Sequence, residues 1–288
     1  MNANKILILV MLTWFSLPLW SGEGWIAFQS RRDGAREIYL VKPDGSGLKR
    51  ITRHRAHDAY PRWSHDGKSL VFSSERKGWW KIWAMDAGGG NVRQLTKTGG
   101  WDAYPAWSHD GKRIYFSGEE RGNIDIWSIE ADGGNRTRIT TNAANDNLPM
   151  PSPDGQQLAF CSNRGDSFDI YLMPIQNGKP TGSNSVKIIA GSFPTWSPDS
   201  QWLSFTSPAD GENEIYIIKK DGSGLKQITS NGADDKWSCW SPDGKSLAFA
   251  SDRDGNWEIY TQALDSGKTR RLTNHQAMDI TPFWSGEK

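Results

Sequence analysis

A nearly identical eight-residue segment occurs twice in this sequence. Residues 60–67 read YPRWSHDG, and residues 104–111 read YPAWSHDG. With the tryptophan of this segment taken as position zero, equivalent positions recur at intervals of 44, 44, 45, 44 and 44 residues: Trp63, Trp107, Pro151, Trp196, Trp240 and Trp284. A fixed period of this length is typical of an array of repeated supersecondary units.

Each repeat reads as four short strands separated by turns. The turn after position zero, S-(H/P)-D-G, suits a tight hairpin because Asp bonds its own backbone and Gly takes a positive φ. Proline stands two residues before position zero in all repeats but one: Pro61, Pro105, Pro149, Pro194 and Pro282. Because proline has no N–H to donate, it places the first strand of each repeat at a sheet edge. A four-stranded repeat with one regular edge is typical of a propeller blade.

The two ends of the repeat region belong to one repeat. The region starts with a second-strand sequence, Trp25–Ser30, and ends with a first-strand sequence, Ile280–Ser285. Pairing of these segments would close the ring and remove free sheet edges. Pro18–Gly24, near the N-terminus, is a second candidate for the first strand. Its tryptophan, Trp20, lies eight residues before Phe28, whereas the other blades have a spacing of nine. We therefore favour the C-terminal strand.

The predicted fold is an all-β, six-bladed β-propeller of four-stranded blades over residues 24–288, closed by the N- and C-terminal strands. The expected blades cover about 58–101, 102–145, 146–190, 191–234, 235–278, and 279–288 together with 24–57.

Residues 1–23 resemble a secretory signal peptide. One lysine precedes an apolar segment, Ile6–Trp20, which is followed by Ser and Gly. The apolar segment is short for a membrane span. We predict a periplasmic or secreted protein without a membrane span once the signal is removed; an uncleaved anchor is the alternative. The two cysteines, Cys161 and Cys239, fall in different repeats, so we expect buried thiols rather than a disulfide.

Charge and motifs restrict the function. The net charge of +1, from 34 basic and 33 acidic residues, argues against a nucleic-acid partner. The sequence contains no GxSxG, no HExxH, no phosphate-binding glycine loop and no paired-cysteine metal motif. It therefore predicts a protein that is not an enzyme and needs no cofactor.

The repeat sequence carries a family resemblance. WSPDGKSLAFASDRDGNWEIY, Trp240–Tyr260, is similar to the WD-like repeat of the TolB family, and the resemblance spans all six repeats. It implies an exported binding platform: TolB lies in the periplasm and binds the lipoprotein Pal through the mouth of its propeller. TolB also carries an α/β domain before the propeller, for which this sequence leaves no room after the signal. The resemblance is therefore to a stand-alone propeller, which we expect to be a monomer that binds a protein or peptide, for example an envelope lipoprotein.

The candidate binding residues lie just before position zero. Five residues before it stands an aspartate in all repeats except the one with Gly191: Asp58, Asp102, Asp146, Asp235 and Asp279. These carboxylates would ring the channel entrance, either to bind a ligand or to fix their own loops through backbone N–H groups. Aromatic residues accompany them: Tyr60, Tyr104, Trp237 and, outside the repeat pattern, Trp101. Such side chains can anchor a peptide. We expect substitution of Trp101, or of Asp58 together with Asp102, to weaken binding with little effect on unfolding.

Recurring charges outside this ring predict ion pairs within blades. The loop after the second strand carries Arg32, Arg76, Arg121, Arg164 and Arg253, and an acid precedes the third-strand aromatic residue: Glu37, Asp125, Asp169, Glu214 and Glu258. We expect these two sets to pair with each other.

Two other functions stay open. His54, His57 and His275, together with nearby aspartates, are weak candidates for a metal site. They would suit a metal-dependent hydrolase or lyase. Surface tryptophans would suit a carbohydrate-binding propeller. The scaffold that binds a protein or peptide is the preferred interpretation.

Overall fold

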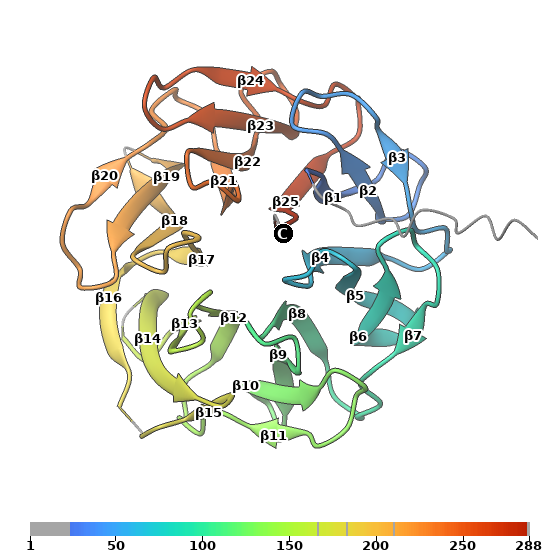
Figure 1. Ribbon diagram of the computed structural model, residues 1–288, viewed down its shortest axis with the longest axis vertical. Coiled ribbons are helices and arrows are strands. Elements are labelled where there is room, and N and C mark those ends of the chain that lie inside the picture. The colour runs from blue at the N-terminus through green and yellow to red at the C-terminus, as the bar shows by residue number, and fades with distance from the viewer. Residues whose placement is uncertain (1–23, 166, 183, 210, 287–288) are drawn as a thin grey trace, which may run out of the picture.

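The computed structural model describes residues 24–165, 167–182, 184–209 and 211–286; the predicted signal peptide over residues 1–23 therefore lies outside the described residues. The described chain forms six sheets arranged in a ring around a central axis (Figure 1). The predicted all-β, six-bladed propeller is confirmed. Over the same residues, no helix has the length and apolar character needed to cross a membrane.

Each blade runs from an inner first strand to an outer fourth strand. Blade 1 holds both ends of the described chain: β25 (Asp279–Trp284), β1 (Ile26–Ser30), β2 (Glu37–Val41) and β3 (Lys49–Arg50). Blade 2 holds β4 (Asp58–Trp63), β5 (Ser69–Lys77), β6 (Trp79–Asp86) and β7 (Arg93–Gln94). Blade 3 holds β8 (Asp102–Trp107), β9 (Arg113–Glu120), β10 (Asn123–Glu130) and β11 (Thr137–Arg138).

The remaining blades follow the same order. Blade 4 holds β12 (Asp146–Pro151), β13 (Gln157–Ser162), β14 (Asp169–Gln176) and β16 (Val186–Ala190). Blade 5 holds β17 (Ser192–Trp196), β18 (Trp202–Ala209), β19 (Glu212–Lys219) and β20 (Lys226–Gln227). Blade 6 holds β21 (Asp235–Trp240), β22 (Ser246–Ser251), β23 (Glu258–Ala263) and β24 (Thr269–Arg271).

Blade 4 differs from the predicted four strands by one short addition. The strand β15 (Lys179–Pro180) pairs with the end of β14, so this sheet has five strands. The connecting residues, Asn177 and Gly178, both have positive φ, at 52° and 73°. An Asn-Gly pair of this kind is the usual two-residue hairpin turn. The addition lies on the outer side of the blade and leaves the channel unchanged.

The ring closes in blade 1, as predicted. β1 pairs antiparallel with β25, with Ile26 opposite Trp284 and Ser30 opposite Asp279. Beyond these strands, the Ser285 N–H donates to the Trp25 carbonyl at 2.8 Å. The pairing brings the first and last strands into one apolar cluster with side chains of blade 6.

Each first strand contains a β-bulge three residues before position zero. The bulged residues adopt left-handed φ values of 54–59°: Tyr60, Tyr104, Leu148, Phe193, Trp237 and Thr281. This conformation is unexpected, because most of these residues precede a proline, which favours an extended backbone. The bulge instead turns the N–H toward the preceding blade. The N–H of Tyr104 donates to Ser73 Oγ at 3.1 Å, and that of Leu148 donates to Ser117 Oγ at 3.0 Å.

Loss of β25 should prevent stable folding. A chain that ends at Met278 leaves β1 as an open edge and exposes the apolar side chains that β25 covers. We expect this variant to aggregate or to lose its cooperative thermal transition, measured by circular dichroism and gel filtration. A chain that ends at Gly286 is the control and should unfold like the full chain. A soluble Met278-terminated monomer with an unchanged transition would contradict the role of closure.

Candidate functional site

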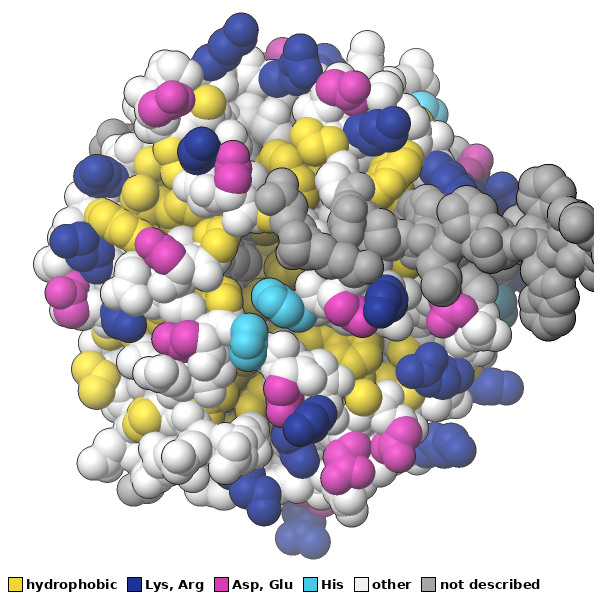
Figure 2. Space-filling view, viewed as in Figure 1, with side chains coloured by type: hydrophobic (Ala, Val, Ile, Leu, Met, Phe, Trp, Pro, Cys, Tyr) yellow, Lys and Arg dark blue, Asp and Glu magenta, His cyan; other side chains and the backbone are white. Residues whose placement is uncertain are grey.

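The central channel has two unequal ends. We call the hairpin mouth the end where the first strands finish and the S-x-D-G turns begin, and the bulge mouth the end where the bulged residues lie. A cavity of about 240 Å³ opens at the hairpin mouth, whereas the chamber behind the bulge mouth holds only about 20 Å³. Figure 2 shows apolar and histidine side chains around the central hollow of the face viewed.

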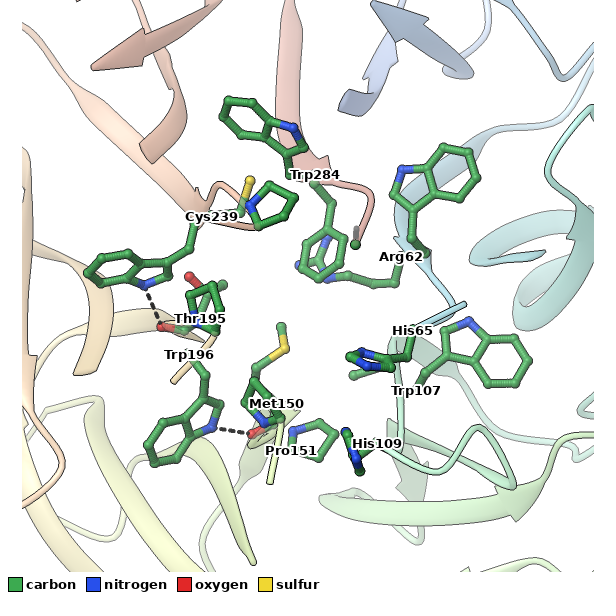
Figure 3. A pocket seen from close by; sticks show the side chains of 18 of the residues that line it. Arg62, His65, Trp107, His109, Met150, Pro151, Thr195, Trp196, Cys239 and Trp284 are labelled. Atoms are coloured by element: carbon green, nitrogen blue, oxygen red, sulfur yellow. Dashed lines mark hydrogen bonds between the residues drawn. The ribbon is translucent and has the colours of Figure 1, made fainter. Parts of the chain in front are cut away.

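The wall of the hairpin-mouth cavity is built from the residues at position zero. Its aromatic members are Trp63, Trp107, Trp196, Trp240 and Trp284. Two of them also connect neighbouring blades (Figure 3): Trp196 Nε1 donates to the Met150 carbonyl at 2.9 Å, and Trp240 Nε1 donates to the Thr195 carbonyl at 3.3 Å. These bonds fix the rings, so the cavity has a rigid and largely apolar wall, as ligand sites usually do.

One charged side chain reaches into this channel. Arg62, one residue before position zero in blade 2, lines both chambers. Its guanidinium lies over the Phe283 ring, with Cζ 4.6 Å from the centroid, and Nη1 donates to the Pro61 carbonyl at 2.9 Å. Burial lowers the pKa of Arg62 to about 10. The site therefore places a cation inside an apolar channel.

Two histidines stand at the hairpin mouth. His65 and His109 replace the proline of the turn in blades 2 and 3, and their ring centroids lie 4.8 Å apart. Burial, followed by the charge of His109, holds the pKa of His65 below its usual 6.5. Sequence reasoning assigned these residues no role; the only signal was the loss of the turn proline in adjacent repeats.

The five predicted aspartates are fully buried and are held by arginines. Four of them lie opposite the serine that precedes their arginine by two residues, as Asp58 lies opposite Ser74, whereas Asp102 lies opposite Gly118. The pairs span 2.5–3.2 Å between nitrogen and oxygen: Arg76–Asp58, Arg136–Asp102, Arg164–Asp146, Arg253–Asp235 and Arg32–Asp279. None of these carboxylates lines either chamber. They fix their loops.

Each arginine also covers the aromatic pair of its blade. In blade 2, the Arg76 guanidinium lies 5.6 Å from the Phe72 centroid and 5.4 Å from that of Trp83. In blade 3, Arg121 occupies a turn with a φ of 56°, and Arg136 from the opposite side of the blade takes its place. Carboxylate, guanidinium and rings thus form one clamp in every blade except blade 5.

The predicted ion pairs within blades are confirmed, but the loop arginines and the acids before the third-strand aromatic residue do not pair with each other. Four of the five acids pair with basic residues of the fourth strand: Glu37–Arg50, Asp125–Arg138, Asp169–Lys187 and Glu258–Arg271. The fifth, Glu214, accepts the backbone N–H of Asn231. The physical reason is the strand order. The loop after the second strand lies beside the start of the first strand, whereas the third strand lies beside the fourth.

The predicted aromatic residues gather around the bulge mouth. Tyr60 and Tyr104 have ring centroids 4.4 Å apart, and Trp101 meets Tyr104 edge-on at 5.7 Å. On another part of the mouth, Trp237 lies 5.1 Å from Trp257. All of these predicted residues are half-buried. They narrow this end of the channel, and their contact with a ligand stays a prediction.

The three candidate metal ligands are engaged in hydrogen bonds with backbone N–H groups of the loops. The Nδ1 atoms of His54, His57 and His275 accept backbone N–H groups of Ala56, Arg36 and Ala277. Over the described residues, no group of three or more His, Cys, Asp or Glu side chains is placed to hold a metal ion. Cys161 and Cys239 are buried free thiols, as expected.

Breaking one buried clamp should destabilise the protein. Asp146 accepts two bonds from Arg164 Nη2, at 2.7 and 2.8 Å. Asp146→Asn leaves the arginine charge without its counterion, and we expect a loss of about 3 kcal/mol in the free energy of unfolding, measured in urea. For Asp58 and Asp102, which are held in the same way, we likewise expect a loss of stability in place of the small effect on unfolding predicted from the sequence. Lys68→Ala, which removes an exposed pair of 3.7 Å, is the control and should cost less than about 0.5 kcal/mol. Equal losses in both variants would contradict the clamp.

Removal of His109 should raise the pKa of His65. His109→Gln removes a like charge from beside His65, so the pKa of His65 should rise toward 6.5 in an NMR titration. Because the folded-state pKa lies below the unfolded value, the folded state resists protonation. The contribution of His65 to stability is therefore present above pH 6.5 and falls as the pH drops through the folded-state pKa. A His65 pKa that stays fixed in His109→Gln would contradict the coupling.

Comparisons with known proteins agree with this architecture. The model of the TolB beta propeller domain matches residues 13–117, 97–186 and 182–288. The Tol-Pal system protein TolB of Syntrophus aciditrophicus is 49% identical over 37 residues, a segment of 13% of this chain and 8% of that protein. The chain is thus matched to only a small part of its curated relative.

Solved structures share the fold at low identity. The crystal structure of TolB from Acinetobacter baumannii superposes with a TM-score of 0.82 at 22% identity, over 93% of this chain and 68% of that chain. An oligogalacturonate lyase from Vibrio parahaemolyticus superposes with a TM-score of 0.54 at 15% identity, over 86% and 73% of the chains. Distant enzymes therefore share the fold. The family model spans the whole propeller, and on this basis the chain belongs to the TolB β-propeller family.

Proposed function

We propose that this protein is a non-enzymatic scaffold of the cell envelope that binds a protein or peptide segment at the hairpin mouth. The observation that carries the proposal is the cavity of about 240 Å³ with its tryptophan wall. This volume lies below the usual ~300–1,000 Å³ of small-molecule pockets. It suits one or two side chains of a protein partner better than a whole substrate.

The chemistry of the cavity also favours binding over catalysis. Its ionisable groups are Arg62, His65, His109 and the thiol of Cys239. Burial raises the pKa of Cys239 to about 12, so the thiol stays protonated and is a poor nucleophile at neutral pH. The wall, in contrast, offers large aromatic surfaces of the kind that anchor peptides.

The family supports a protein partner and an envelope location. The curated relatives are named Tol-Pal system proteins. Together with the predicted signal peptide over residues 1–23, this supports export and capture of an envelope protein. The aromatic residues of the bulge mouth, Trp101 among them, are a second docking surface to be tested against the first.

A peptide selection with matched variants tests the proposal. Dodecapeptides would be selected from a random library on the purified protein, and their Kd values measured by isothermal titration. Met150→Trp fills the hairpin-mouth cavity and should weaken binding at least about tenfold, since buried contact area is lost. Trp79→Ala is the control, because Trp79 is 67% exposed and lies outside both chambers.

Three outcomes decide between the surfaces. Loss of binding in Met150→Trp alone supports the hairpin mouth. Loss in Trp101→Ala alone moves the site to the bulge mouth. A selection that yields no peptide, or binding that survives both substitutions, contradicts a channel site for peptides. Thermal transitions of all variants exclude losses caused by unfolding.

A further inference from the structure

The channel contains a cation that differs from the other buried arginines. At the position before position zero, blade 2 has Arg62, whereas the other blades have uncharged residues: Ala106, Met150, Thr195, Cys239 and Phe283. The loop arginines of the clamps each face a fully buried aspartate. In the part of the chain that the structure describes, Arg62 makes no ion pair, and neither chamber is lined by Asp or Glu.

The guanidinium also has unused hydrogen-bonding capacity. Arginine carries five N–H donors, and a buried donor without an acceptor is costly. Within residues 24–286, Nη1 of Arg62 donates to the Pro61 carbonyl, and the buried Nε has no acceptor. The Arg62 side chain extends into the cavity that His65 and His109 also line (Figure 3), and its guanidinium lies over the Phe283 ring. Nε is buried, so the terminal nitrogens are the donors that a ligand in the cavity could reach.

Among the described residues, the acidic side chains at this mouth do not neutralise the site. The turn aspartates do not line the cavity, and each accepts a bond from the serine of its own turn at 2.5–2.7 Å: Asp66, Asp110, Asp154, Asp199 and Asp243. The cavity itself combines one cation, two titratable histidines and an aromatic wall. This combination is complementary to an anionic group attached to an apolar one.

We propose that Arg62 is the anchor for a carboxylate of the bound peptide, either an acidic side chain or a C-terminus, whose apolar neighbour packs on the tryptophan wall. The proposal rests on the proposed function and specifies the chemistry of its ligand. Planar guanidinium and carboxylate groups match in a two-bond geometry, and the largely apolar wall strengthens each bond. An uncharged isostere of the same shape should lose this contact and keep the apolar one.

Matched pairs of small peptides test the anchor on the full chain. N-acetyl-leucyl-phenylalanine would be titrated as the free acid and as the C-terminal amide by isothermal titration. N-acetyl-aspartyl-phenylalanine amide and its asparaginyl counterpart form the second pair, which presents the carboxylate on a side chain. We expect at least one acid to bind about tenfold more tightly than its uncharged partner, as one charge-assisted bond allows. The pair that shows the preference identifies the source of the carboxylate.

Variants assign the preference to Arg62. In Arg62→Gln, the preference for the acid over the uncharged peptide should fall below about twofold, while the affinity for the uncharged peptides is unchanged. Arg62→Lys should keep part of this preference. The thermal transition of Arg62→Gln should be unchanged or higher, because no ion pair of the described residues is lost. Met150→Glu is a second variant that leaves Arg62 in place. Its carboxylate shares both chambers with Arg62 and should abolish the preference.

Each result decides the proposal. Equal binding of acid and uncharged peptides to the natural protein, or a preference that survives Arg62→Gln, overturns the anchor and leaves the peptide-binding function standing. Binding of trigalacturonate through Arg62, with no binding of any peptide, overturns both the peptide source and the proposed function. No binding of any probe overturns both as well. In Glu287→Gln, the affinity of the protein for the acid peptides could rise more than about tenfold. That result would show that the chain's own C-terminal segment fills the site, and it would overturn the proposal of an external ligand.

Discussion

Closure of the ring by β1 and β25 is the constraint on which the rest of the structure depends. A blade alone is a small sheet with two edges, and an open array of blades would leave both ends unpaired. Pairing Ile26 with Trp284 converts that array into a closed ring. Only in a closed ring do the first strands converge on one axis, and their convergence creates the channel in which Arg62 and the tryptophans meet.

Within five of the six blades, a second interaction holds the start of the first strand. A buried aspartate, an arginine and an aromatic pair form a clamp that satisfies the charges and covers the rings in one arrangement. Blade 5 supports this interpretation, since it has Gly191 in place of the aspartate and no arginine at the equivalent position. There, Phe205 and Tyr216 stack at 5.7 Å without the clamp. The aspartates thus take part in blade construction, and our proposal assigns ligand recognition to residues that depart from the repeat.

Those departures gather at one end of the channel. His65 and His109 replace turn prolines, and Arg62 replaces an uncharged residue, all in blades 2 and 3. The blades share one backbone structure, but within the described residues only blades 2 and 3 place basic side chains at the cavity of the hairpin mouth. Under the proposed function, this asymmetry would orient a bound segment: its charged group would lie toward blade 2, and its apolar group would lie against the remaining tryptophans.

The sequence alone determined the period, the number of blades, the edge position of the first strands and the closing pair, because these follow from spacing, proline chemistry and the phase of the two ends. The tertiary structure alone decided the left-handed bulge at Tyr104, the partner of Asp58 and the width of each mouth. A repeat pattern specifies what one blade contains. Which side chains share a chamber, and whether Arg62 finds a counterion there, depends on contacts across the axis between blades far apart in sequence.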